Sequence, residues 1–390
     1  MRLGRSRTIV VLTLGATQTL AWGSTFYLPA VLADPVAVDL HLSRDWFFGI
    51  FSGSLLLSAF LGPAVGRFID RRGGRDVLAL SNIVFAAGLV LLALSAGPVG
   101  LAAAWTVLGV GMALGLYEPA FATLAGLYGR EARGAITGIT LMAGFASTIG
   151  WPVTSFLTQI VGWRETCLIW AALHILLGLP ANRLLVPAAP PPERQPVGAE
   201  GEATAEASTT LILLATMFGA MAFVSSAMAA HLPRILAAWG VSPAAAVGAA
   251  ALVGPAQVAA RLVEFGMLRR VSPLASARLA SALHPIGAAC FAVLGAPGAI
   301  AFALLHGAGN GMLTIARGTL PLALFGAGGY GLRTGWLAAP ARVTQAGAPL
   351  LFGLLLDRVG PGAALLLSSG LSLVGLAALA AMRMRRPAVA

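Results

Sequence analysis

Three charged residues, Glu118, Arg317 and Arg342, lie inside long apolar stretches of the sequence. A charge near the centre of a bilayer costs at least about 2.5 to 3.5 kcal/mol, so each of them needs a partner, a water-filled cavity or a function. At 1.5 Å per residue, each lies roughly 12 to 15 Å from one end of its stretch, which is near the midplane of a bilayer.

The chemistry of these three residues is complementary. A carboxyl group such as that of Glu118 can take up and release a proton, whereas arginines stay charged and offer forked donors that suit a carboxylate or another oxyanion. Glu118 and Arg317 also occupy nearly equivalent places in an internal repeat, so we expect them to face one central cavity from opposite sides. We predict that Glu118 carries a proton and that Arg317 and Arg342 clamp an anion. In the alternative role, Glu118 pairs with one arginine and only holds the helices together.

Polar and aromatic side chains near these charges are candidates for the lining of the same cavity, because pockets combine aromatic walls with a few polar groups. They are Trp22, Ser24, Thr25, Tyr27, Tyr117 and Asn310. Packing explains any one of them equally well. Arg261 and Glu264 are expected to form a pair at the rim. The lone histidines of the apolar stretches are expected to be buried and satisfied. They are His174, His284 and His306.

The elements that hold these residues belong in a membrane, judging from composition. Hydrophobic residues make up 58% of the chain and charged residues 10%, against about 45 to 50% and about 25% in a soluble domain. Apolar stretches of about twenty residues, long enough to cross roughly 30 Å of hydrocarbon, occur throughout. They are 8–33, 46–69, 76–96, 99–127, 133–160 and 163–187, then 209–232, 241–267, 273–293, 297–325, 333–356 and 361–382. We therefore predict an all-α integral membrane protein with twelve transmembrane helices in two pseudo-symmetric six-helix bundles.

The domain boundaries follow from the polar segment between the two sets of stretches. Residues 1–187 are predicted to form the N-terminal bundle and 209–390 the C-terminal bundle. Residues 188–208, rich in Pro, Ala and Glu, read as a flexible cytoplasmic linker. Helix breaks are expected at Pro119, Pro285 and Pro340.

Arginine supplies all the basic residues, and its distribution predicts the orientation of the chain in the membrane. The formal net charge of +11 could suggest a nucleic-acid partner, but the arginines fall in short loops rather than in a stripe with aromatics. With the N-terminus in the cytoplasm, only Arg44, Arg164, Arg234 and Arg358 fall in segments outside. This asymmetry predicts a multi-pass protein of the cell (inner) membrane with both termini cytoplasmic and no nucleic-acid partner.

An internal repeat supports two related halves. The triplet Gly62-Pro63-Ala64 recurs as Gly254-Pro255-Ala256, and Gly134, Gly138 and Pro152 are matched by Gly331, Gly335 and Pro349. Repeated six-helix halves around a central site are a known architecture of transporters.

One loop carries the most specific local pattern in the chain. Gly66 would let another helix approach closely, and Asp70 could meet a helix N-terminus or an arginine at the cytoplasmic rim. We predict that the two halves are latched here by Gly66, Asp70, Arg71, Gly73 and Arg75. The run from Gly66 to Arg75 resembles the G-x-x-x-D-R-x-G-x-R signature of the major facilitator superfamily.

The resemblance covers nearly the whole chain and implies the twelve-helix fold of that family, with two bundles that alternate access to a site between them. The second half lacks a good copy of the signature, and residues 353–360 repeat only its first part, G-x-x-x-D-R-x-G. Gly162-Trp163-Arg164 and Ser43-Arg44-Asp45-Trp46 are similar to segments of bacterial members related to monocarboxylate and oxalate transporters. The helix-5 pattern of drug antiporters is not met by residues 144–156.

Together these observations predict a secondary active transporter that moves a small organic solute, most simply an organic anion, coupled to protons and acting as a monomer. A drug exporter is one alternative. Another is a copper transporter, because Met217, Met221, Met228 and His231 would suit a soft ion, although methionines at helical spacing usually pack in a core. No nucleotide-binding loop and no catalytic dyad or metal set is evident. We therefore expect no enzyme activity and no cofactor.

Overall fold

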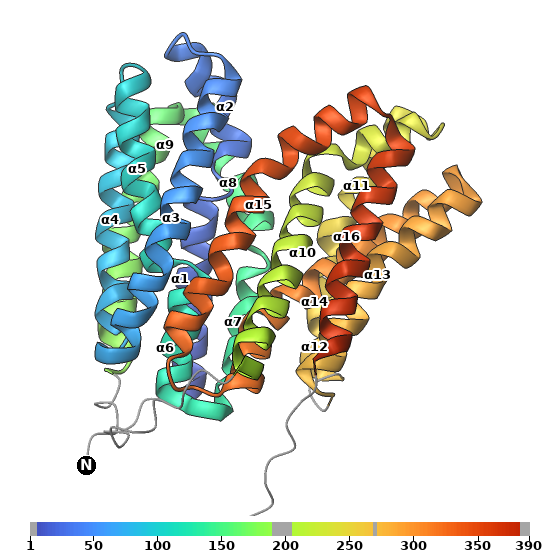
Figure 1. The fold of residues 1–390 in the computed structure, drawn as a ribbon. Helices are drawn as coiled ribbons and strands as arrows, with labels where there is room; N and C mark the ends of the chain where they lie inside the picture. Colours follow the sequence, from blue (N-terminus) through green and yellow to red (C-terminus); the bar gives the residue numbers. More distant parts are fainter. Residues whose placement is uncertain (1–5, 189–204, 268–270, 383–390) are drawn as a thin grey trace, which may run out of the picture. The chain divides into compact units, whose positions relative to one another are not determined.

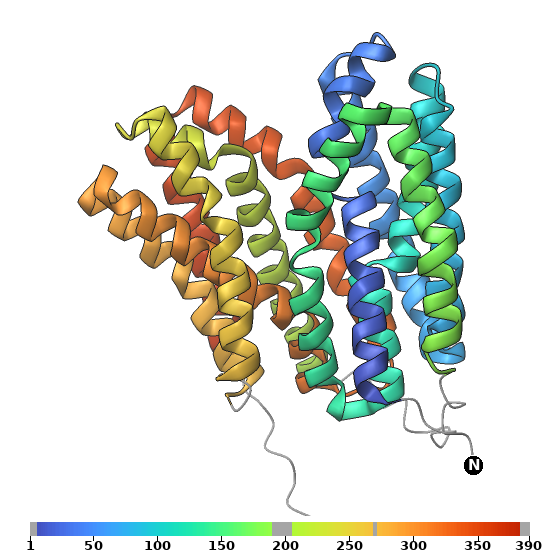
Figure 2. The ribbon, with the colours of Figure 1, turned by 180° about the vertical axis from the view of Figure 1, so that it is seen from behind.

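The computed structural model describes residues 6–188, 205–267 and 271–382, and its regular elements are helices. Most of the predicted linker, residues 188–208, lies outside the described residues. The chain divides into two compact units, Met1–Glu193 with Phe325–Trp336, and Arg194–Leu324 with Leu337–Ala390. Figures 1 and 2 show the helices of the chain as ribbons coloured along the sequence.

The first unit contains the helices of the first half of the chain. They are α1 (Arg7–Ser24), α2 (Pro29–Asp39), α3 (Arg44–Arg72), α4 (Arg75–Ala93), α5 (Pro98–Gly115), α6 (Tyr117–Tyr128), the short η1 (Gly129–Glu131), α7 (Ala132–Ala143), α8 (Ala146–Val161), α9 (Trp163–Leu173) and two π-helical turns, η2 (His174–Gly178) and η3 (Ala181–Leu185). The second half consists of α10 (Ala205–Ala238), α11 (Pro243–Ala251), α12 (Val253–Gly266), α13 (Pro273–Leu294), η5 (Ala296–Gly298), α14 (Ala299–Phe325), α15 (Tyr330–Arg358) and α16 (Pro361–Ala381).

The length and composition of these helices fit a bilayer, in which every backbone group must be satisfied within the segment. Among the described residues, nine helical stretches are long and apolar enough to cross a membrane. One of them, Pro98–Val161, covers two of the predicted segments. The two predicted segments outside these stretches are α15, whose apolar run is interrupted by charged residues, and the pair α11 and α12, which are short. The protein is an all-α integral membrane protein.

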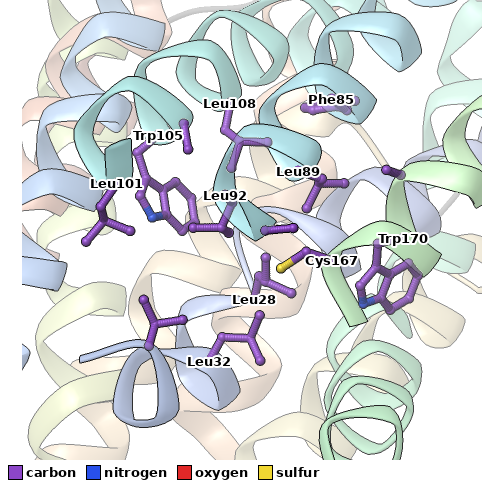
Figure 3. Close-up of a cluster of buried hydrophobic side chains, with 14 of the residues drawn as sticks. Leu28, Leu32, Phe85, Leu89, Leu92, Leu101, Trp105, Leu108, Cys167 and Trp170 are labelled. Carbon is purple, nitrogen blue, oxygen red and sulfur yellow. The ribbon is translucent and has the colours of Figure 1, made fainter. Parts of the chain in front are cut away.

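The core of the first unit forms where α4 packs against α5 and α9. Trp105 of α5 is fully buried there, against Phe47 and Phe51 of α3, with ring centroids 5.8 and 4.9 Å away. Leucines of α4 and α5 surround the indole, and Cys167 of α9 packs into the same cluster (Figure 3). In a bilayer, apolar side chains packed in this way hold helices together through van der Waals contacts, so the cluster fixes these helices to one another.

Several predicted segments are two helices rather than one. Residues 8–33 contain the break between α1 and α2, 99–127 the break between α5 and α6, and 133–160 the break at Gly144 and Phe145 between α7 and α8. Residues 241–267 divide at Leu252, and 163–187 end in the π-helical turns.

The predicted proline breaks are correct at one position and wrong at two. The chain does break at Leu116, just before Pro119 in the first turn of α6. It does not break at Pro285 or Pro340, because α13 and α15 continue through them. A membrane helix tolerates an internal proline when neighbouring groups re-satisfy the freed backbone.

In the second unit, α16 packs against α10 and α13. Met217 and Met221 of α10 are buried in this contact and lie against Gly375 of α16. Met228 is buried as well, and the ring Nε2 of His231 lies 2.8 Å from the carbonyl oxygen of Pro349. These contacts are those of a packed helix face.

Candidate functional site

An aromatic cluster occupies the helix breaks of the first unit. The ring of Trp22, near the end of α1, lies 4.8 Å from that of Tyr117 at the start of α6 and 6.0 Å from that of Tyr27. Tyr27 lies in the break between α1 and α2, and its carbonyl oxygen accepts a hydrogen bond from the indole of Trp151 at 3.1 Å. The structure therefore brings three of the predicted lining residues together at points where regular hydrogen bonding is interrupted.

Glu118 stands directly beside this cluster, in the first turn of α6. A helix N-terminus stabilises a carboxylate, and the side chain is half-buried. The backbone at the preceding break is held by Gln18 of α1, whose amide donates to the carbonyl oxygen of Gly115 at 2.6 Å. Gln18 is 2% exposed and was not singled out in the sequence. The Glu118 carboxylate also acts electrostatically on the hydroxyl of the buried Tyr330.

The remaining predicted contacts lie in the second unit. Asn310 and Arg317 are seven residues apart on α14, which places them on one face of that helix, and the Oδ1 of Asn310 accepts a hydrogen bond from Ser225 at 2.6 Å. Arg317 and Arg342 are both half-buried. The predicted apposition of Glu118 and Arg317 joins the two units and stays a prediction.

The predicted latch residue Asp70 lies at the N-terminus of α15. Its two carboxylate oxygens accept hydrogen bonds from the backbone N–H groups of Gly331 and Leu332, at 2.8 and 2.9 Å. These N–H groups belong to the first turn of α15, which has no intrahelical acceptors for them. The carboxylate therefore caps the helix, and its charge faces the positive end of the helix dipole.

Glycines allow the two backbones to meet next to this cap. A Cβ at Gly66 would overlap the carbonyl of Gly331, and a Cβ at Gly335 would lie 2.7 Å from the backbone of Gly62. Gly335 and Gly62 lie one helical turn further along the same contact. The close approach expected for Gly66 is thus made to the first turns of α15.

The other latch residues surround this contact without joining it. Gly73 ends α3 with a positive φ of 81°, a conformation that favours glycine. Arg71 is exposed, and Arg75 lies 3.0 Å from Asp76 through its Nε. We find no described bond from Arg71 or Arg75 to Asp70.

Several expectations about polar residues need correction. Ser24 and Thr25 are fully buried, and Ser24 is hydrogen-bonded to the Nε2 of His174 at 2.8 Å. The Nδ1 of His174 meets the Oδ1 of Asn82 at 2.9 Å. These residues form an internal network between α1, α4 and η2 rather than the wall of a cavity. His174 is buried and satisfied, as expected.

Arg261 and Glu264 lie near the end of α12 and are both about 95% buried in the second unit, and their expected place at the rim stays a prediction. Arg261 donates to Thr314 at 3.2 Å, and Glu264 accepts a hydrogen bond from Ser276 at 2.8 Å. His284 and His306 are buried, as expected, and their rings contact each other, but the Nε2 of His284 has no hydrogen-bond partner among the described residues.

Comparison with known proteins agrees with this architecture. The family model of the Major Facilitator Superfamily matches residues 13–305. The nitrite extrusion protein of Bacillus subtilis (strain 168) is 25% identical over 184 residues, 44% of this chain and 45% of that protein. An MFS-type efflux pump of Mycolicibacterium smegmatis is 32% identical over 155 residues, 39% of this chain and 35% of that protein. The chain thus spans less than half the length of these curated relatives.

Solved structures show the same fold over nearly the whole chain. The outward-conformation crystal structure of the transporter FucP has a TM-score of 0.78 at 13% identity and covers 96% of this chain and 99% of that one. The human organic anion transporter MFSD10 has a TM-score of 0.68 at 16% identity and covers 96% of this chain and 98% of that one. The helices, the Asp70 signature and the matched family model lead to one conclusion: the chain belongs to the Major Facilitator Superfamily.

Proposed function

We propose that this protein is a secondary active transporter that moves a small organic solute by alternating access, with protons as the coupling ion. The observation that carries the proposal is Glu118, a half-buried carboxyl group in the first turn of α6, beside a helix break and an aromatic cluster. An ionisable residue at membrane depth is expensive to keep, and such residues mark solute pathways and proton relays.

Proton coupling requires that the charge of the carrier bias the conformation of the protein. Tyr330 connects Glu118 with Asp70 electrostatically, because both carboxylates act on its buried hydroxyl group. Neutralising Glu118 therefore changes the electrostatic environment at the first residue of α15, where Asp70 caps the helix. We propose that this contact is the latch and that it forms in one conformation of the transport cycle.

An organic anion is the solute class that the second unit favours. Arg317 and Arg342 are half-buried in α14 and α15, and guanidinium groups bind carboxylates through paired hydrogen bonds. Solved relatives of the same fold include FucP, a fucose:proton symporter, and XylE, a proton:xylose symporter, as well as the organic anion transporter MFSD10. The family fold thus accommodates both the coupling ion and the solute class proposed here.

The test compares Glu118→Gln with Glu131→Gln in proteoliposomes. Glu131 is exposed and pairs with Arg7 at the end of η1, so its substitution controls for the loss of one carboxylate. We expect Glu118→Gln to abolish uptake driven by a pH gradient while exchange of solute without net proton movement continues. Intact proton-driven uptake would refute the carrier role. Loss of exchange together with a lower melting temperature would instead favour the structural role of Glu118.

The solute class is tested by thermal stabilisation, because a ligand that binds the folded state raises its apparent stability. Candidate carboxylates should stabilise the purified protein, and Arg317→Gln or Arg342→Gln should remove this effect. Arg234→Gln is the matched control, since Arg234 is exposed and paired with Asp357. Stabilisation by carboxylates that survives both arginine substitutions would exclude the anion clamp.

Export of a cationic or apolar compound is the second candidate. The aromatic cluster of Trp22, Tyr27 and Tyr117 favours it, because aromatic faces attract cations and a carboxylate stands beside them. Stabilisation by lipophilic cations, but not by carboxylates, would favour this candidate.

For either solute we propose a monomer in the inner membrane, with both termini in the cytoplasm.

A further inference from the structure

Two histidines of the second unit form a contact that the transport proposal does not use. His284 of α13 and His306 of α14 are each 4% exposed. Their Nδ1 atoms lie 2.9 Å apart and their ring planes are tilted by 72°. Both rings also lie near Phe302, at centroid distances of 5.4 and 6.4 Å. The pair is thus embedded among apolar side chains within predicted membrane segments.

The distance between the facing nitrogens identifies what lies between them. A separation of 2.9 Å fits one N–H···N hydrogen bond. Two imidazoles that share a zinc ion at about 2.0 to 2.1 Å each would hold their nitrogens about 3.3 Å apart or more in tetrahedral geometry. The geometry therefore matches a single shared proton better than a metal ion.

Counting protons gives the state of the pair. Two neutral imidazoles carry two protons on four nitrogens, and one of these protons lies between the Nδ1 atoms. The second proton is on the Nε2 of whichever ring accepts the shared hydrogen bond. The donor ring therefore keeps one free lone pair, also at Nε2. Adding a proton there gives a singly charged pair in which the central hydrogen bond remains and both Nε2 atoms are protonated.

In the charged pair His284 Nε2 carries a proton whichever ring donates the shared hydrogen bond in the neutral pair. It is buried and has no hydrogen-bond partner in the part of the chain that the structure describes. A buried N–H or lone pair without a partner is costly, and a charged ring without one is costlier still. Uptake of the proton at low cost therefore requires water or another polar group to reach His284 Nε2.

Charged groups on the neighbouring elements are engaged elsewhere. On α12, Arg261 donates to Thr314 and Glu264 accepts from Ser276. Arg278, at the start of α13, donates to backbone carbonyls at the end of α16, at 2.8 to 3.0 Å.

On α10, which contacts α13 through Trp239 at its C-terminal end and α14 through Ser225, His231 bonds to the carbonyl of Pro349 and Arg234 pairs with Asp357. Arg317 lies eleven residues after His306 on α14, roughly 16 Å along the helix. The sequence of α16 contains no charged residue. The partner imidazole is therefore the neighbour with which each ring exchanges a proton.

We propose that His284 and His306 form a proton-binding dyad in the second unit, which takes up one additional proton when His284 Nε2 becomes hydrated. The dyad rests on the proposed function for its link to proton coupling, and it is a site separate from Glu118. Its occupancy would follow the access of water to α13 and α14.

The test is ¹⁵N NMR of protein labelled at histidine in lipid bilayers, between about pH 5 and pH 8, where imidazoles titrate. We expect the signals of His284 and His306 to move together and to share one bridging proton. His306→Asn should remove the coupled behaviour of His284. His231→Asn is the matched control, because that ring bonds to the carbonyl of Pro349 in the same unit. It should leave the dyad unchanged.

Two results would overturn the dyad. One is a pair of rings that stay neutral over this pH range. The other is a His284 signal that is the same in wild-type protein and in His306→Asn. If His306→Asn does not fold, the titration of the wild-type protein alone tests the dyad. The measurement needs no transport. If the histidines do not titrate but Glu118→Gln loses proton-driven uptake, the dyad alone is refuted. If the histidines titrate and Glu118→Gln keeps proton-driven uptake, the role of Glu118 alone is refuted.

Discussion

The cap that Asp70 makes on α15 can be tested by replacing the carboxylate with an amide of the same shape. In wild-type protein both oxygens accept backbone N–H groups, from Gly331 and Leu332. Asn in place of Asp70 keeps one acceptor and turns an NH₂ group toward the other N–H. The change removes one charge-assisted hydrogen bond, about 1.5 to 3 kcal/mol, and a favourable interaction with the helix dipole, about 0.3 to 1 kcal/mol.

A loss of about 2 to 4 kcal/mol corresponds to a roughly 30- to 700-fold larger population of the open contact, since 1.4 kcal/mol is tenfold. Hydrogen exchange followed by mass spectrometry measures this directly, because amide exchange reports local opening. We expect the amides of Gly331 and Leu332 to exchange faster in Asp70→Asn by about that factor. Asp76→Asn is the control, since Asp76 is exposed and pairs with Arg75. Equal exchange in wild type and Asp70→Asn would refute the cap.

Three further substitutions test the packing. Gly66→Ala should destabilise the contact of α3 with α15 by about 1 to 3 kcal/mol through overpacking; Gly254→Ala, whose Cβ would meet no described atom within 4 Å, should not. Asn82→Ala should lower the free energy of unfolding by about 1 to 3 kcal/mol, because buried His174 loses a partner; an unchanged melting temperature would contradict the network. Arg164→Gln should cost at most about 1 kcal/mol in thermal unfolding, because its ion pair with the end of α2 is partly exposed.

The sequence predicted the membrane class and the existence of most helices because a bilayer demands long apolar segments, and such segments are visible in any window of about twenty residues. It did not predict where helices break. The interruption at Gly144 and Phe145 has no proline, while α13 runs through Pro285. Whether a break forms depends on which neighbour satisfies the freed backbone, as Gln18 does at Gly115, and that neighbour is distant in sequence.

The candidate site could also be predicted only in part from the sequence. The signature around Asp70 indicated the kind of partner, a helix N-terminus or an arginine. It did not indicate which helix, because the capped residue Gly331 of α15 lies 261 residues further along the chain. The aromatic cluster could be suspected because Trp22, Tyr27 and Tyr117 are large polar-edged residues in apolar segments. The pairing of His284 with His306 had no local signal, because it arises from the packing of two helices and not from spacing along one.

The helix α15 belongs partly to each of the two compact units. The boundary between the compact units falls at Trp336 and Leu337, inside the continuous α15. While Asp70 caps the first turn of α15, no loop separates the two portions of this helix. Pro340 lies four residues beyond Trp336 and cannot donate a hydrogen bond to its carbonyl, which weakens α15 close to this boundary.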